Sequence, residues 1–119
     1  MTNLTDEVTK DSLPAFTDAW NRHDIDALMS FMTDDCVFET SDGTRYEGHE
    51  AVRAAFSGVW AAFPDAHWGA DCHFASGDRG VSEWVFTGTQ PDGTRIQEKG
   101  CDIFTFRNGK IAFKSTYLK

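Results

Sequence analysis

The sequence lacks any segment that would anchor the chain in a membrane. No run of about 18 apolar residues, the length a membrane-spanning helix needs, occurs in the 119 residues. The first residues, Met1 to Glu7, contain neither a basic region nor an apolar one, so they do not have the pattern of a signal peptide. We therefore expect no membrane partner and a location in the cytoplasm.

Basic residues are also scarce. The chain has 11 Lys and Arg against 19 Asp and Glu, which gives a formal net charge of −8. Nucleic acids and anionic lipid surfaces are bound mainly through Lys and Arg. We therefore expect no nucleic-acid partner. The length supports one domain over residues 1–119, in which residues 1–10 can form a loose N-terminal segment.

Motifs for cofactors, metals and disulfides are missing. The three cysteines contain no Cys-x-x-Cys pair, and each lies in an apolar or alternating run, which favours small buried side chains. There is no glycine-rich phosphate loop, no Gly-x-Ser-x-Gly motif and no metal-ligand spacing. We expect neither a cofactor nor a metal. Asp71 and His73 form an i, i+2 pair, which we interpret as part of a polar outer sheet face rather than as ligands.

The spacing of apolar residues predicts helices in the first half of the chain. The first begins at Asp11 or Ser12, with Pro14 in its first turn. The second follows Asp24 and has an apolar stripe that ends at Met32. A third, shown by the same spacing, follows the glycine at position 48 and ends before the next proline.

The second half of the chain is typical of strands joined by tight turns. Asp-Gly at 42–43, Asp-Gly at 92–93 and Asn-Gly at 108–109 are strong hairpin signals. The strands predicted around them cover residues 36–40, 45–46, 66–75, 81–88, 96–106 and 111–118.

Helices first and strands last predict an α+β domain. We expect a cone-shaped barrel made of a strongly curved, mostly antiparallel sheet, with three N-terminal helices packed on its concave face. Gly69, Gly88 and Gly100 are placed where bends or bulges can curve the long strands.

Five segments resemble the nuclear transport factor 2-like superfamily, and more narrowly its SnoaL-like and ketosteroid isomerase-like branch. In family order they are Trp20–Leu28, Asp34–Phe38, Tyr46–Phe56, Phe86–Thr89 and Gly100–Ile111. The resemblance implies a small organic ligand. It leaves two classes of function open: a cofactor-independent acid/base enzyme (an isomerase, cyclase, lyase or hydrolase) acting on a small apolar carbonyl compound, or a non-catalytic binding module or small accessory subunit.

Asp102 is the first candidate for a catalytic residue. It lies in an apolar segment, and strand alternation places it on one face with Phe104 and Phe106. A carboxyl among aromatic rings has a raised pKa, which favours a protonated group that acts as an acid or donates a hydrogen bond to an oxyanion. The resemblance implies the same role, because a protonated aspartate occupies this position in ketosteroid isomerase. The alternative is a structural pair with a nearby Lys or Arg.

Two other catalytic positions of ketosteroid isomerase are changed. By resemblance, its oxyanion-hole tyrosine falls on Phe16, which has no hydroxyl, and its general-base aspartate falls on Thr40. We therefore do not expect steroid isomerase activity.

Lys114 is the second catalytic candidate, and its face depends on the Asn108-Gly109 turn. A two-residue turn places Asp102 opposite Ser115, whereas a three-residue loop with a glycine bulge places it opposite Lys114. The family alignment favours the second register, in which Lys114 enters the cone as an ion-pair partner or an electrophilic amine. The alternative is a solvated lysine on the outer face.

The aromatic residues predict a pocket and an interface. Residues expected to line the pocket are Phe16, Trp20, Phe38, Thr40, Phe56, Trp60, Trp84 and Phe104. We also expect a homodimer through the outer sheet face, with Ile111, Phe113 and Tyr117 on that face. Glu83 lies either in the cone or at this dimer face.

Overall fold

The computed structural model describes the backbone of residues 4–119 and, within the first helix, the side chains from residue 11 onward. Residues 1–3, the start of the segment for which a loose N-terminus is expected, lie outside the described residues. The elements in chain order are α1 (Leu4–Asn21), α2 (Ile25–Ser30), β1 (Met32–Glu39), β2 (Arg45–Glu47), α3 (His49–Ala62), β3 (His67–Ser76), β4 (Arg79–Thr89), β5 (Arg95–Arg107) and β6 (Lys110–Leu118).

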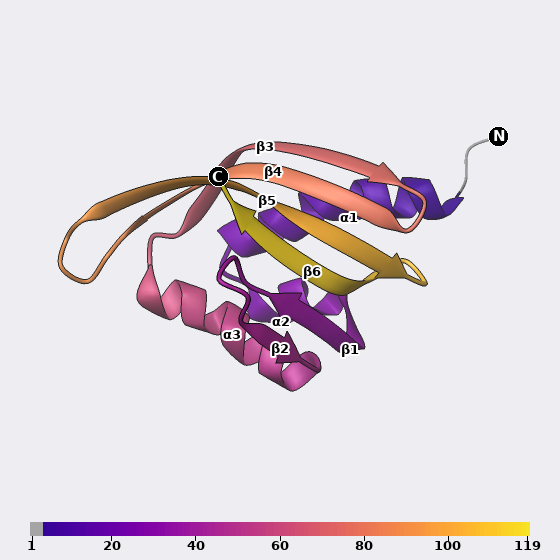
Figure 1. The fold of residues 1–119 in the computed structure, drawn as a ribbon, viewed down its shortest axis with the longest axis horizontal. Coiled ribbons are helices and arrows are strands. Elements are labelled where there is room, and N and C mark those ends of the chain that lie inside the picture. Colours follow the sequence, from indigo (N-terminus) through magenta and orange to yellow (C-terminus); the bar gives the residue numbers. More distant parts are fainter. Residues whose placement is uncertain (1–3) are drawn as a thin grey trace.

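One curved sheet of six strands forms the body of the fold, in the order β2-β1-β6-β5-β4-β3. The β1–β6 pair is parallel and the other neighbouring strands are antiparallel. Figure 1 shows the sheet arching over α1, with α3 beside β1 and β2 and the β4–β5 hairpin reaching beyond the helices. The predicted α+β fold with helices on the concave face is confirmed. The sheet is not closed into a barrel.

Two helix boundaries differ from the prediction. α1 begins at Leu4, before the cap expected at Asp11 or Ser12, and Pro14 lies inside the helix. A proline there removes one helical hydrogen bond, so packing of the helix against the sheet outweighs the local stop signal. Helix α2 ends at Ser30, and Met32 begins β1 as a buried residue. No helix among the described residues is long and apolar enough to cross a bilayer.

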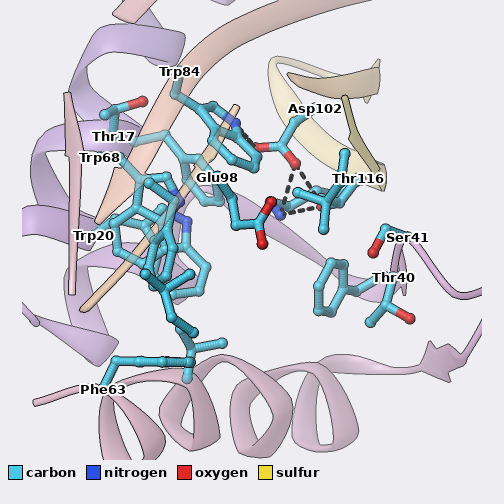
Figure 2. A pocket seen from close by; sticks show the side chains of 17 residues that line it. Thr17, Trp20, Thr40, Ser41, Phe63, Trp68, Trp84, Glu98, Asp102 and Thr116 are labelled. Carbon is cyan, nitrogen blue, oxygen red and sulfur yellow. Dashed lines mark hydrogen bonds and ion pairs between the residues drawn. The ribbon is translucent and has the colours of Figure 1, made fainter. Parts of the chain in front are cut away.

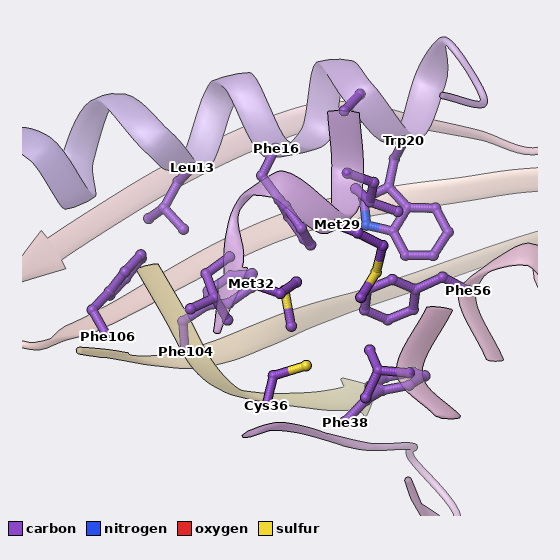
Figure 3. Close-up of a cluster of buried hydrophobic side chains, with 14 residues drawn as sticks. Leu13, Phe16, Trp20, Met29, Met32, Cys36, Phe38, Phe56, Phe104 and Phe106 are labelled. Carbon is purple, nitrogen blue, oxygen red and sulfur yellow. The ribbon is translucent and has the colours of Figure 1, made fainter. Parts of the chain in front are cut away.

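The hydrophobic core lies between α1 and the concave face of the sheet (Figure 3). Phe16 is at its centre, where edge-to-face ring contacts join it to Trp20, Phe56 and Phe104 at centroid distances of 6.4, 6.4 and 5.8 Å. Such ring pairs stabilise a core beyond the area they bury. This packing fixes α1 over β5 and so sets the position of the site described below.

The β5–β6 hairpin has a register that neither sequence prediction contained. Its tip is a two-residue turn, because Arg107 pairs with Lys110 and both Asn108 and Gly109 have positive φ. Just after Ile111 the register shifts by one, since Phe106 pairs with Ile111 but Thr105 pairs with Phe113. Ala112 is therefore the extra residue of a bulge. Asp102 is opposite Thr116, and Lys114 is opposite Phe104.

The residues on the outer face of β6 differ from the prediction. Ile111 and Phe113 lie on opposite faces because the extra residue between them changes the alternation. Ile111 is fully buried in the core and is not an outer-face residue, whereas Tyr117 is 53% exposed. Glu83 pairs with Cys101 on the convex face and is exposed, so it does not enter the cone.

A second bulge, in β3, turns His73 toward the concave face. The register against β4 shifts between Gly69 and Cys72, and Ala70 has a φ of 50°. The interpretation of His73 as an outer-face residue is therefore wrong, because the shift reverses the alternation. Cys72 is exposed rather than buried for the same reason, whereas Cys36 is buried and Cys101 is half-buried.

Candidate functional site

A cavity of about 400 Å³ lies between the concave face of the sheet, α1 and α3 (Figure 2). Aromatic residues are the largest group in its wall, and among the described residues its ionisable lining groups are Glu98, Asp102 and Lys114. Strands β5 and β6 supply all three of these groups. The cavity is therefore an apolar space with its charge confined to one wall, and its volume falls within the range of small-molecule sites.

Asp102 and Lys114 form a buried ion pair at the sheet wall of this cavity. The Lys114 Nζ lies 3.1 Å from Asp102 Oδ1, and the two residues are only 4% and 6% exposed, respectively. The bulge in β6 produces this contact, because it places Lys114 and Thr116 on the same face as Asp102. Lys114 thus lies on the face that the favoured sequence register predicted, although the register itself differs.

Hydrogen bonds fix the orientation of both charged groups. The Trp84 Nε1–H donates to Asp102 Oδ2 at 2.9 Å, and the Thr116 hydroxyl donates to Oδ1 at 2.5 Å. Lys114 Nζ donates to Thr116 Oγ1 at 3.0 Å. Three donors thus converge on the Asp102 carboxylate: the Lys114 ammonium, the Trp84 indole N–H and the Thr116 hydroxyl. The structure thus shows the alternative that the sequence left open, a pair between Asp102 and a nearby lysine.

Lys114 keeps one N–H without a hydrogen-bond acceptor among the described residues. An ammonium carries three donors, and Asp102 and Thr116 account for two. Its remaining side faces aromatic rings: Nζ lies 4.4 Å from the centroid of Phe38 and 5.5 Å from that of Phe56. Aromatic faces stabilise a cation without consuming its donors. The third N–H is therefore available to an oxygen of a bound molecule.

Gly100 allows Trp84 to reach Asp102. Trp84 pairs with Gly100 across β4 and β5. A Cβ at position 100 would lie 2.4 Å from the carbonyl oxygen of Tyr117 and 2.9 Å from the Trp84 ring. Only a glycine fits this close approach, and the indole can therefore lie over the strand with its N–H directed at the carboxylate.

The structure places most of the predicted pocket residues at the wall and the others behind it. Phe16, Trp20, Phe38, Thr40 and Trp84 line the cavity. Phe56 and Phe104 do not, because they are packed one layer deeper in the core. Trp60 also lies outside the wall: its indole N–H donates to the Trp20 carbonyl, and its ring stacks on His23 at 5.2 Å.

Thr40 lines the mouth of the cavity, but its hydroxyl is committed to the neighbouring turn. It donates to the carboxylate of Asp42, which also accepts the backbone N–H of Thr44. These hydrogen bonds, that of Thr40 first, lower the pKa of Asp42 to about 2. Asp42 therefore remains ionised above that pH and accepts the hydrogen bond of the Thr40 hydroxyl. This hydroxyl is directed at the turn and does not replace the general-base carboxylate that ketosteroid isomerase has at this position.

Sequence reasoning missed Glu98 and three of the aromatic residues at the wall, Phe63, Trp68 and Phe86. Glu98 carried a usable signal, because residues 98, 100, 102 and 104 share one face of a regular strand. Trp68 is on the concave face, opposite to His67, but it was not among the residues predicted to line the pocket.

A hydrogen-bonded chain of Asp71, His73 and Ser82 lies beside the site. His73 contacts Asp71 through Nε2 and Ser82 through Nδ1, both at 2.7 Å. The hydrogen bond from His73 lowers the pKa of Asp71. Ser82 is 2% exposed and does not line the cavity, so it is not placed to attack a ligand there. No group of three or more His, Cys, Asp or Glu side chains among the described residues is arranged to hold a metal ion.

The fold and the site define the class of protein as a small α+β domain of the nuclear transport factor 2-like type, with a curved sheet closing over helices around an aromatic cavity. The model of the SnoaL-like domain matches residues 13–113, and the chain belongs to this family. The resemblance given by the sequence segments is thus confirmed. No curated protein matches the chain.

Solved structures share this fold along almost the whole chain. A candidate SnoaL-like polyketide cyclase from a Jannaschia species superposes with a TM-score of 0.90 at 18% identity, over 100% of this chain and 90% of its own. A candidate polyketide cyclase from Xanthomonas campestris gives 0.89 at 21% identity, over 97% and 93%. A protein with a ketosteroid isomerase-like fold from Catenulispora acidiphila, in complex with trimethylamine, gives 0.80 at 19% identity, over 88% and 82%.

Proposed function

We propose that the cavity binds a small organic molecule and that the protein is a cofactor-independent acid/base enzyme acting on a small, mainly apolar carbonyl compound. The observation that carries this proposal is the buried Lys114 ammonium, held by Asp102 and Thr116 in an aromatic cavity with one N–H unused. The relatives described as candidate polyketide cyclases, and the trimethylamine bound by the Catenulispora protein, support a small organic ligand.

The type of reaction that we propose follows from the unused N–H of Lys114, which can donate a hydrogen bond to a ligand in the cavity. A ligand carbonyl oxygen that accepts it gains more stabilisation as negative charge develops on the oxygen, so the site favours enolisation and the isomerisation or cyclisation steps that begin with it. Asp102 also positions Lys114 for this reaction, because its carboxylate holds the ammonium in place. Asp102 and Glu98 are the carboxylates that line the cavity and are able to receive a proton.

Exchange of α-protons into D2O tests this proposal without knowledge of the natural substrate. A panel of small aryl ketones and 1,3-diketones is incubated with the protein in D2O, and loss of the α-proton signals is followed by NMR. We expect at least one compound to exchange faster with the protein than without it. If compounds bind but none of them exchanges faster with the protein, the proposed enzymatic activity is contradicted. That result would favour the alternative, a non-catalytic binding module or accessory subunit.

We also propose that two copies of the chain associate through the convex face of the sheet. Phe74 and Tyr117 are 56% and 53% exposed on this face, which is a large apolar exposure for the surface of a small protein. Sedimentation velocity at micromolar concentration is expected to give twice the chain mass of 13.3 kDa. Sedimentation at the single-chain mass would contradict the dimer and would leave the cavity proposal unaffected.

The cytoplasm is the compartment that we propose for this protein. All three cysteines are free thiols, and the most accessible of them, Cys72, lies on the exposed convex face. Burial raises the pKa of Cys36 and of Cys101, which keeps both as thiols. Unpaired thiols of this kind are typical of proteins in a reducing compartment.

A further inference from the structure

Glu98 is a charged group of the cavity wall that has no partner in the part of the chain that the structure describes. It extends from β5 on the same face as Asp102, four residues earlier in the strand, and is half-buried. No hydrogen bond or ion pair joins its carboxylate to any of the described residues. Figure 2 shows its side chain reaching into the cavity, with the carboxylate on the side of Asp102 and Thr116.

The charges of the wall do not cancel without a ligand. Asp102 and Lys114 neutralise each other, and Glu98 then leaves the cavity with a net negative charge. The adjacent Lys99 does not compensate it, because strand alternation places that side chain on the opposite face, where it pairs with Val85. A neutral, fully apolar ligand would cover this carboxylate without giving it a hydrogen bond, which costs binding free energy.

The surroundings of Glu98 suit an organic cation. Phe86 is its direct cross-strand neighbour. The Phe86 ring centroid lies 5.1 Å from that of Trp68 and 5.3 Å from that of Phe63, so aromatic rings form a continuous wall beside the carboxylate. A carboxylate next to aromatic faces attracts an ammonium group by charge and by cation–π contact together. The net charge of −8 of the chain acts in the same direction over longer range.

From this arrangement we infer that Glu98 forms a cation subsite, so that the preferred ligand carries a protonated amine or another organic cationic nitrogen. This inference rests on the proposed function in one respect, which is that the cavity binds a small organic molecule. It extends that proposal by giving the ligand two polar ends: a nitrogen that binds at Glu98 and an oxygen that binds at Lys114, with an apolar part between them.

Two probes of equal shape and different charge test the inference. 2-Phenylethylamine is cationic at neutral pH and 2-phenylethanol is its neutral counterpart, and their dissociation constants are measured by ligand-observed NMR. We expect the amine to bind at least about tenfold more tightly, because only the amine adds a positive charge to its hydrogen bond with the Glu98 carboxylate. Glu98→Gln is expected to remove this preference while leaving the affinity for the alcohol nearly unchanged.

A matched variant controls for the overall charge of the protein. Glu83→Gln removes the same charge from an exposed position on the convex face, and it is expected to keep the amine preference of the unsubstituted protein. Thermal unfolding of both variants confirms that they are folded. Higher ionic strength is expected to weaken binding of the amine but not of the alcohol.

Several outcomes would overturn the inference. Equal binding of amine and alcohol, or tighter binding of 3-phenylpropionate, would show that the cavity does not select cations, while binding of the alcohol would leave the small-molecule proposal in place. Binding of none of the probes would contradict both. An amine preference that survives in Glu98→Gln, together with a loss of α-proton exchange, would identify Glu98 as a proton acceptor instead.

Discussion

Replacing Lys114 with methionine is expected to lower the rate of α-proton exchange of any ketone that the protein turns over by about 10²- to 10³-fold. Methionine fills a similar apolar volume but supplies no N–H to the developing oxyanion. The loss falls on the chemical step more than on binding, because a hydrogen bond to a charged oxyanion is stronger than one to a neutral carbonyl. Exchange rates and apparent dissociation constants from the same NMR titration separate the two effects.

Lys110 on the same strand provides the matched control for this prediction. It is exposed at the tip of the hairpin, outside the cavity, so Lys110→Met removes an equal charge without touching the site. We expect this variant to exchange ketones at the rate of the unsubstituted protein. A Lys114→Met protein that is folded and retains full exchange would exclude Lys114 from the reaction.

The second large effect concerns stability. Asp102→Leu is expected to lower the free energy of unfolding by about 3–5 kcal/mol, because it leaves the Lys114 ammonium buried without its counter-charge. The Trp84 N–H and the Thr116 hydroxyl lose their acceptor in the same variant. Urea unfolding followed by tryptophan fluorescence measures this loss, with the midpoint and the slope analysed separately.

A double variant separates charge from packing in this result. When Asp102→Leu is combined with Lys114→Met, neither charge of the buried pair remains, and most of the lost stability is expected to return. The interaction free energy of the two substitutions is then large and favourable in the double-mutant cycle. If the double variant is as unstable as Asp102→Leu alone, packing rather than charge stabilises this part of the sheet, and the unpaired ammonium is not the cause of the lost stability.

Much of the fold could be predicted because its signals are local. The Asn108-Gly109 dipeptide identifies a tight turn, and alternating apolar residues identify the long strands on both sides of it. The turn has the two-residue form, not the three-residue loop that the family alignment favoured. The bulge at Ala112 could not be predicted, since alanine carries no bulge signal and the extra residue is set by how β6 fits between β1 and β5. That single residue places Phe113 on the outer face and Lys114 on the concave face, whereas the two-residue turn places Ile111 in the core.

The candidate site was partly visible in the sequence for similar reasons. Asp102 could be found because a carboxyl within an apolar strand is unusual, and its face follows from alternation. Its partners could not be found, because Lys114 and Trp84 reach it across strand pairs set by a bulge and by the close approach at Gly100. Glu98 lies on the same face of the same strand and went unnoticed because its neighbours are polar.

The central claim is that the Lys114 ammonium donates a hydrogen bond to an oxygen of the bound molecule, and a comparison of two ligands tests it most directly. Acetophenone and ethylbenzene differ chiefly in the carbonyl oxygen, and their dissociation constants are measured for the unsubstituted protein, Lys114→Met and the Asp102→Leu, Lys114→Met double variant. We predict that the preference for acetophenone over ethylbenzene falls by about tenfold or more in both variants, because both lack the donor. An unchanged preference in the double variant, which retains no charge of the pair, would contradict the claim.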